Sequence, residues 1–250
     1  MYLEMLYTTI EKEGDAPMRI NKFLGATGVT SRRGADKLIE AGRVTINGAP
    51  AELGSRVNDS DVVKVDGKRV RRENELVYIA LHKPVGITST TERHIKGNVV
   101  DYINHPLRIF HIGRLDKDSE GLLLMTNDGD IVNEILREEH GHEKEYIVTV
   151  DRPITNEFVR TMESGVPILG TMTKPCKVVP LGKNTFNITL TQGMNRQIRR
   201  MTDALGFTVT KLKRTRIINI HLGDLPYGEW RELTPDETSE LFSILNYKPQ

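Results

Sequence analysis

The feature that most constrains the fold is a charged run, Arg69–Glu75 (RVRRENE), that separates two different hydrophobic patterns. Before it, apolar residues recur at helical spacing and then alternate in short segments. After it, most segments alternate with period two. A run this polar is typical of a linker at the surface, and 250 residues leave room for two domains. We therefore predict a flexible lead-in at 1–17, a small domain at 18–75 and a larger domain at 76–250.

The small domain is predicted to consist of two helices followed by short strands. Ile20, Phe23 and Leu24 share one face of the first helix. Ser31 is a suitable N-cap for the second helix, and Gly42 stands where its C-terminal cap is expected. Two dipeptides then predict turns between strands: Asn47-Gly48 and Asp66-Gly67.

The larger domain is predicted to be rich in strands, with a few helices between them. Alternation predicts strands at 76–82, 146–150, 186–190 and 217–221, and helical spacing predicts helices at 131–137, 196–205 and 235–245. Runs of strands with scattered helices favour an α+β fold with a largely antiparallel sheet.

Charge is distributed unevenly along the chain, although the net charge is only +1. Residues 18–72 carry a net charge of +6, and residues 193–216 hold seven basic residues against one acid. Two basic regions on a nearly neutral background indicate a polyanionic partner that is contacted at two places, unless these are simply solvated faces. No apolar run approaches the roughly 20 residues that span a bilayer. The single cysteine, Cys176, excludes an internal disulfide and a multi-cysteine zinc site, which fits a reducing cytoplasm.

Basic side chains gather on the two predicted helices of the small domain. Arg32, Arg33 and Lys37 lie near one another on the second helix, and two residues of the first helix can join them, Arg19 and Lys22. Cations in the first turn oppose the helix dipole by roughly 0.3–1 kcal/mol each, and a phosphate backbone across that helix end would reverse the effect. Alternatively, both arginines point into water.

The stretch at 18–68, which includes Ser31-Arg32-Arg33 and Ala35-Asp36, strongly resembles an S4 domain, a small RNA-binding module. The resemblance implies RNA as the partner. It identifies neither the RNA nor a catalytic activity.

An acidic loop, Gly113–Gly121 (GRLDKDSEG), carries the most informative motif of the larger domain. Its alternating carboxylates imitate an EF-hand, but position twelve counted from Asp116 is Asn127 and flanking helices are not expected. A glycosidase-like pair of Asp116 and Asp118 would need an unusual loop, because the two are close in sequence. A polar turn without catalytic function is the remaining alternative.

The segment GRLDKDSEGLLLMTNDG resembles the catalytic signature of the RNA pseudouridine synthases. Further matches follow in the family's order: HKPVGITST at 82–90, EKEYIVTV at 143–150, GVPILGTMTKPCKV at 165–178 and QGMNRQIRRM at 192–201. The chain is most similar to the branch with the small-subunit enzyme A and the large-subunit enzymes B, E and F, and within it to the F group. The resemblance implies a small N-terminal S4 domain and a catalytic domain built on a mainly antiparallel, mixed β-sheet with flanking helices.

The resemblance also implies the catalytic residues. Asp116 matches the essential carboxylate, which could add to the sugar, add to the base or take a ribose proton. Tyr146 matches the tyrosine expected to stack on the uracil, although it could also be an ordinary core residue. Arg199 matches the arginine expected to pair with Asp116. The resemblance thus implies a buried Asp116–Arg199 pair, which would compensate one of the cations at the start of the predicted helix, for which Asn195 is a plausible N-cap.

Further residues are expected to contact RNA. Arg114 matches a residue thought to fill the space that a flipped base leaves, unless it only fixes the acidic loop. Lys83 is expected to contact a phosphate or a loop, and His82 stands where the family has Asn. Two more arginines lie at the start of the predicted helix at 196–205: Arg196 and Arg200. Cations are unfavourable at a helix N-terminus unless an anion lies opposite, so these two are expected to face RNA phosphates.

The expected activity is therefore isomerisation of a uridine in structured RNA after base flipping, without cofactor or metal. The resemblance favours 23S ribosomal RNA near the peptidyl-transferase region. Transfer RNA, or a non-catalytic role in RNA binding or ribosome assembly, remains an alternative. We expect a cytoplasmic monomer that does not contact a membrane.

Overall fold

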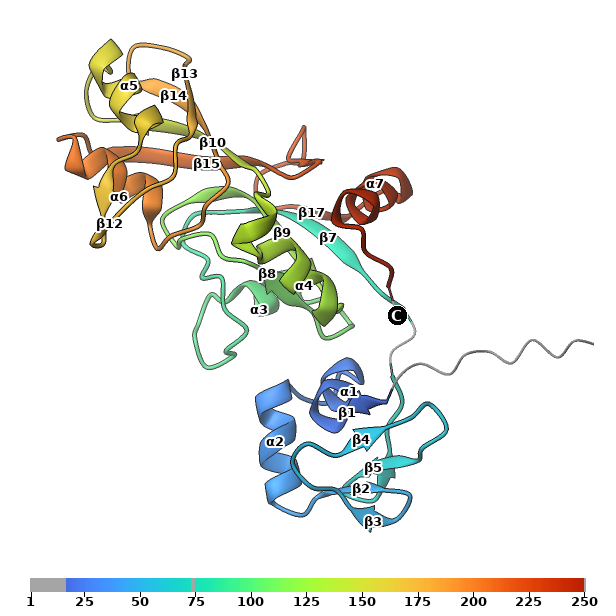
Figure 1. The fold of residues 1–250 in the computed structure, drawn as a ribbon. Coiled ribbons are helices and arrows are strands. Elements are labelled where there is room, and N and C mark those ends of the chain that lie inside the picture. The colour runs from blue at the N-terminus through green and yellow to red at the C-terminus, as the bar shows by residue number, and fades with distance from the viewer. Residues whose placement is uncertain (1–16, 73–74, 250) are drawn as a thin grey trace, which may run out of the picture. The chain divides into compact units, whose positions relative to one another are not determined.

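The computed structural model describes residues 17–72 and 75–249, and the chain divides into two compact units, 1–75 and 76–250 (Figure 1). All but one residue of the predicted lead-in at 1–17 lies outside the described residues. Among the described residues, no helix is both long and apolar enough to cross a membrane. Each unit has a hydrophobic core of its own.

The described residues of the first unit, 17–72 and 75, form two helices and six short strands: β1 (Met18–Arg19), α1 (Ile20–Ala26), α2 (Arg32–Glu40), β2 (Val44–Ile46), β3 (Ala49–Pro50), β4 (Arg56–Val57), β5 (Val63–Val65) and β6 (Lys68–Arg69). The strands form a sheet of order β3-β2-β5-β6 and a separate β1-β4 pair. The apolar faces of α1 and α2 pack on this sheet through Ile20, Leu24 and Ala35, all fully buried.

Local signals of the first unit are confirmed. The Ser31 hydroxyl accepts a hydrogen bond from the Gly34 backbone N–H at 3.0 Å, as an N-cap should. Gly42 follows α2 with a φ of +68°, and Asn47 and Gly48 both have positive φ, as a tight hairpin turn requires.

The second unit is built around a nine-stranded mixed sheet whose main path runs β13-β14-β10-β15-β9-β7-β17. Its strands are β7 (Tyr78–Lys83), β8 (Phe110–Ile112), β9 (Glu120–Thr126), β10 (Lys144–Val150), β13 (Lys177–Pro180), β14 (Thr185–Leu190), β15 (Val209–Ile217), β16 (Ile220–His221) and β17 (Trp230–Glu232). β11 (Pro167–Ile168) and β12 (Thr171–Met172) form a separate hairpin. All pairs in the sheet are antiparallel except β9 with β15, so the predicted α+β class with a largely antiparallel sheet is correct.

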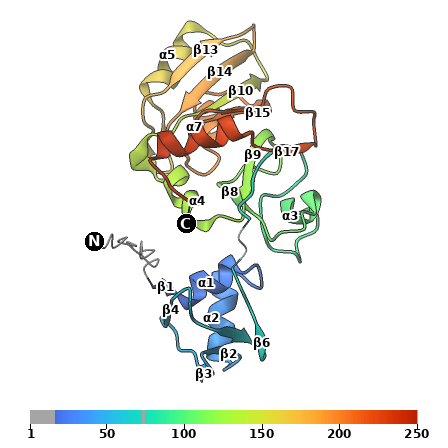
Figure 2. The same cartoon turned by 90° about the vertical axis from the view of Figure 1, so that its right-hand side faces the viewer.

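The apolar run Leu122–Met125 is explained by burial of β9 on both faces. Leu122 and Leu124 pack with α4 (Gly129–Leu136) and α7 (Pro235–Leu245) on one face, whereas Leu123 and Met125 pack with α3 (Val99–Ile103) on the other. Figure 2 shows α7 in front of the sheet. A strand covered on both faces carries consecutive apolar residues rather than an alternation.

The other half of the sheet, β10 with β13–β15, is covered by α5 (Asn156–Ser164) and α6 (Gln197–Ala204). The predicted helix at 235–245 is confirmed with its bounds, because Thr234 and Glu237 form a capping box and Pro235 is the first helical residue. The predicted strand at 217–221 is wrong as one element. Ile218 has a φ of +55° and makes the turn between the end of β15 and β16.

Candidate active site

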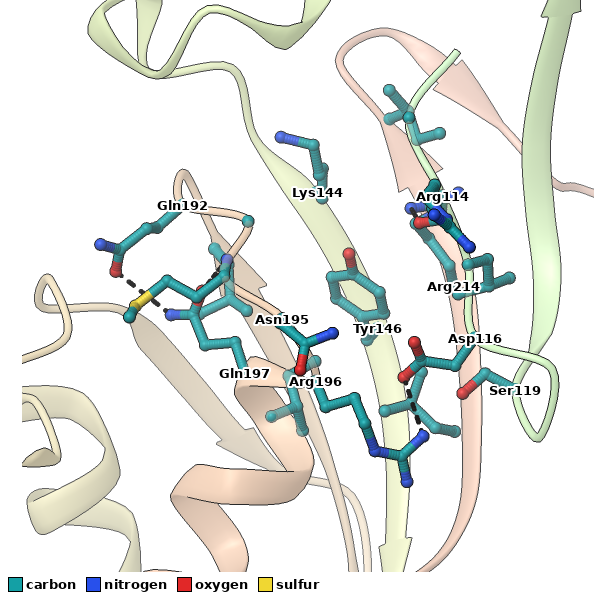
Figure 3. Close-up of a pocket in the computed structure, with 18 of the residues that line it drawn as sticks. Arg114, Asp116, Ser119, Lys144, Tyr146, Gln192, Asn195, Arg196, Gln197 and Arg214 are labelled. Atoms are coloured by element: carbon teal, nitrogen blue, oxygen red, sulfur yellow. Dashed lines mark hydrogen bonds and ion pairs between the residues drawn. The ribbon is translucent and has the colours of Figure 1, made fainter. Parts of the chain in front are cut away.

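A pocket of about 610 Å³ opens where three segments of the second unit meet: the β8–β9 loop, strand β10 and the start of α6 (Figure 3). Asp116, Tyr146, Arg196 and Arg199 all line it, so the structure brings the central residues of the sequence prediction together. Its volume lies in the range of pockets that enclose a small molecule or one nucleotide-sized group.

The loop that carries Asp116 is fixed at several backbone positions. Ser119 N–H donates to the Asp116 carbonyl at 3.1 Å, and the buried Ser89 hydroxyl donates to the Leu115 carbonyl at 2.7 Å. Gly86 N–H donates to the Lys117 carbonyl at 2.7 Å. The carboxylate therefore stands on a backbone whose geometry is set by neighbouring loops, while its own side chain stays 34% exposed to the pocket.

The ion-pair partner of Asp116 is Arg196, whose Nη1 lies 3.5 Å from Oδ2. The predicted Asp116–Arg199 pair is wrong. The predicted N-cap, Asn195, is also wrong: α6 begins at Gln197, and its N-cap is Arg196 in the left-handed conformation with a φ of +50°. This backbone turn directs the Arg196 side chain to the acidic loop, where it also binds Asp118 through two hydrogen bonds of 3.0 and 3.1 Å. Those bonds hold the pKa of Asp118 below its usual value.

Arg199 is the second arginine that holds the acidic loop in place. Its Nη2 donates to the Asp118 carbonyl at 3.0 Å and to the Ser119 hydroxyl at 3.1 Å, and Nη1 donates to the Val209 carbonyl at 3.3 Å. The side chain is only 12% exposed. Arg199 thus supports the Asp116 loop without binding the Asp116 carboxylate.

Tyr146 lies on β10 with its ring beside Asp116 (Figure 3). The ring is partly buried against the core of this half of the domain. The Arg214 guanidinium lies 6.0 Å from the ring centroid, on the neighbouring strand β15. Tyr146 is therefore both a core residue on one side and a pocket wall on the other.

Arg214 is a pocket residue that the sequence patterns did not single out. It is 3% exposed, lines the pocket, and donates from Nε to the Leu122 carbonyl at 2.7 Å and from Nη1 to the Arg114 carbonyl at 3.3 Å. Nη2 is buried and has no hydrogen-bond partner among the residues that the structure describes. The alternation of β15, in which Leu212 and Arg214 are both buried, was the available signal, because a cation at an inward position needs a reason.

Lys83 is not placed to bind RNA, so that part of the prediction is wrong. Its side chain is fully buried, and Nζ donates to the carbonyls of Pro84 at 2.8 Å and Ile87 at 2.9 Å. Burial, followed by the charge of Arg214, lowers its pKa to about 8. Of the two contacts that the sequence suggested, the loop contact is the one found. His82 is buried beside it, and its Nδ1 lies 2.8 Å from the Leu225 carbonyl.

The other predicted RNA contacts lie on the surface. Arg114 is exposed and lines the pocket, and Arg200 is half-buried and donates to the Asn195 carbonyl at 3.0 Å. In the first unit, Lys22 is half-buried, and four basic residues are exposed: Arg19, Arg32, Arg33 and Lys37. Within residues 17–72 and 75–249, no group of three or more His, Cys, Asp or Glu side chains could hold a metal ion.

A family model described as RNA pseudouridylate synthase matches residues 77–204, and a model of the S4 domain matches residues 18–63. The dual-specificity RNA pseudouridine synthase RluF of Salmonella typhi is 56% identical over 233 residues, which are 92% of this chain and 81% of that protein. The ribosomal large subunit pseudouridine synthase B of Bacillus subtilis is 40% identical over 239 residues, 92% of this chain and 97% of that protein.

A solved structure described as a pseudouridylate synthase superposes with a TM-score of 0.67 at 30% identity. It covers 90% of this chain and 99% of that one. These matches lead to one conclusion: the chain belongs to the RNA pseudouridine synthases and carries an S4 RNA-binding domain at its N-terminal end.

Proposed function

We propose that this enzyme isomerises a specific uridine of large-subunit ribosomal RNA to pseudouridine, with Asp116 as the essential carboxylate. The observation that carries the proposal is the position of Asp116: its carboxylate faces the pocket beside the Tyr146 ring and is held by Arg196 at 3.5 Å. The names of the relatives RluF and large-subunit synthase B favour an RNA substrate of this kind.

The reaction rearranges bonds within one nucleotide. The bond between C1′ and N1 breaks, the uracil turns, and a bond between C1′ and C5 forms. C5 then loses its proton and N1 gains one, so nothing is oxidised or reduced. A carboxylate that adds to the sugar or to the base, or that accepts a ribose proton, must be ionised when it acts, and the Arg196 guanidinium is the counter-charge beside it.

Tyr146 and Arg114 would handle the base. The Tyr146 ring offers a stacking surface for the uracil, and its hydroxyl is directed into the pocket. A uracil stacked on the ring would bring its C5 proton near that hydroxyl. A uridine inside folded RNA must leave its stack to reach this pocket. The exposed Arg114 side chain at the pocket rim is suited to occupy the vacated position, because a guanidinium plane stacks on bases.

The exposed basic residues of the first unit, Arg32 and Arg33 among them, would bind the RNA backbone. Such contacts release counterions, so the proposal requires affinity that falls with salt and a shallower salt dependence when Arg32 and Arg33 are replaced together by Gln. As part of the same proposal, the enzyme acts as a monomer in the cytoplasm.

Transfer RNA is a second candidate substrate, favoured by the dual specificity in the name of RluF. The test uses transcripts of both RNA classes, tritiated at C5 of uridine. We expect tritium release from the ribosomal transcript with the wild-type enzyme, and at least about 10³-fold slower release with Asp116→Asn, as is usual when an essential group is removed. Release at the normal rate from Asp116→Asn would refute the role of Asp116. Release from transfer RNA alone would transfer the proposal to that substrate.

A further inference from the structure

Lys144 is a half-buried cation in the catalytic pocket that the reaction described above does not use. It lies on β10 two residues before Tyr146, so both side chains leave the same face of the strand. Both line the pocket, and Figure 3 shows Lys144 on the far side of Tyr146 from Asp116 and Arg196. The two ends of the pocket therefore carry different charge arrangements.

At the Asp116 end, the two arginines at the start of α6 have carboxylate partners. Arg196 binds the carboxylates of Asp116 and Asp118, and Arg199 reaches Asp118 at 3.5 Å. At the other end, Lys144 has no carboxylate partner in the described part of the chain, because each nearby acid binds another cation. Glu138 pairs with Lys174 at 3.0 Å. Arg216 pairs with the two glutamates that flank Lys144 in the sequence, Glu143 at 2.7 Å and Glu145 at 3.6 Å.

Within the described residues, Lys144 makes no ion pair, and its one polar contact is a long one, from Nζ to the His142 carbonyl at 3.5 Å. Burial, followed by the charge of Arg214, lowers the pKa of Lys144, and the opposing effect of the Glu138 charge is smaller than either. Partial burial of a cation near a second cation is unfavourable in the free enzyme. An anion that enters the pocket would reverse the sign of this interaction.

We infer that Lys144 binds a phosphate of the RNA backbone adjoining the uridine that enters the pocket. The inference rests on the proposed function, because it takes the Tyr146 ring as the seat of the uracil. Two residues along a strand span about 7 Å, so a nucleotide stacked on Tyr146 has a neighbouring phosphate within reach of the flexible lysine side chain. A full negative charge matches this end of the pocket better than a neutral uracil carbonyl does, since Lys acts as a point charge toward phosphates.

The test measures binding in the Asp116→Asn background, so that turnover does not enter the result. The affinity for an RNA stem-loop that contains the target uridine is compared between Asp116→Asn alone and Asp116→Asn combined with Lys144→Met. We expect about tenfold weaker binding and a salt slope that falls by about 0.7–0.9, the amount for one phosphate contact. In the active enzyme, Lys144→Met should lower kcat/KM through a higher KM, with kcat nearly unchanged. Lys144→Arg should restore most of the affinity.

The phosphate itself is identified with RNA that carries a neutral methylphosphonate on the 5′ or the 3′ side of the target uridine. One of these two substitutions should weaken binding to the Lys144 protein about tenfold and leave binding to Lys144→Met unchanged. If the loss of affinity caused by Lys144→Met multiplies with the loss caused by the methylphosphonate on the 5′ side and also with that on the 3′ side, the inference is overturned. An unchanged salt slope together with weaker binding would overturn it in favour of a contact with the base.

Two controls distinguish a phosphate contact from a general loss of positive charge and from a loss of folding. Lys177 is exposed on the edge strand β13 and gives a matched charge removal outside the pocket, so Lys177→Met should bind as the parent does. Lys144→Met should keep or raise the midpoint of thermal unfolding, whereas a purely structural role would lower it. If the Asp116→Asn protein binds no RNA at all, the proposed function fails; if it binds and Lys144→Met makes no difference, only this inference fails.

Discussion

Arg196 connects the two aspartates of the acidic loop: its Nη1 lies 3.5 Å from Asp116, and its guanidinium makes two hydrogen bonds to Asp118. It does so from a left-handed backbone conformation that costs a non-glycine residue on the order of 1 kcal/mol. Unfavourable backbone geometry at a residue that contacts the central carboxylate indicates that the position serves the site rather than the stability of α6.

Replacement of Arg196 by Gly should therefore separate activity from stability. We expect kcat/KM to fall by about 10²-fold, since the counter-charge of Asp116 and the tie to Asp118 are both lost. The free energy of unfolding should stay within about 1 kcal/mol of wild type, because the pair is partly exposed and glycine relieves the strained φ. Tritium release and urea denaturation measure the two quantities. A stable, fully active Arg196→Gly protein would contradict the role of the ion pair.

Arg199→Met should affect both properties together. The side chain donates three hydrogen bonds from a nearly buried position, to Asp118, Ser119 and Val209. Their loss removes the donor from two partly buried acceptors and one exposed acceptor, so we expect a destabilisation of about 1–3 kcal/mol in urea denaturation and little remaining tritium release. Arg199→Lys should recover part of the stability. Near-normal turnover by Arg199→Met would show that the Asp116 loop holds its shape without this support.

Gly121 should tolerate no side chain. It has a φ of +112°, and a Cβ placed on it would lie 2.3 Å from the carbonyl oxygen of Arg214 on the adjacent strand. We expect Gly121→Ala to lower the free energy of unfolding by about 3 kcal/mol or more, through backbone strain and separation of β9 from β15. Gly182→Ala is the matched control, because that site is open and its φ is not positive. It should change stability by less than about 0.5 kcal/mol.

Lys83 should make stability depend on pH in the alkaline range. Its pKa is lowered by burial from 10.5 to about 8, so between these values the unfolded chain binds more protons at this site than the folded one. Stability therefore rises with pH from about 8 to 10.5 through this group, by on the order of 3 kcal/mol. Urea denaturation of wild type and Lys83→Met across this range isolates the contribution as a difference. Parallel curves for the two proteins would mean that Lys83 titrates normally.

The elements that were predicted correctly have local causes. The cap of α2 at Ser31 and the capping box at Thr234 depend on residues within three positions, and the strands β10 and β14 follow their own alternation. The presence of Asp116 and Tyr146 in one pocket was expected from the resemblance to the family motifs. No short-range pattern in the sequence predicts that these two residues lie close together.

Which arginine reaches Asp116 was decided by the tertiary structure. Arg196 and Arg199 are three residues apart, so helical spacing places both near the acidic loop and does not distinguish them. The left-handed turn at Arg196 and the packing of α6 on β15 determine that one guanidinium meets the carboxylate and the other meets the backbone behind it. The buried positions of Lys83 and Arg214 have the same origin, because burial depends on strands distant in sequence. Local patterns determine caps, turns and strand periods, whereas the partner of a long cationic side chain depends on how separate elements pack.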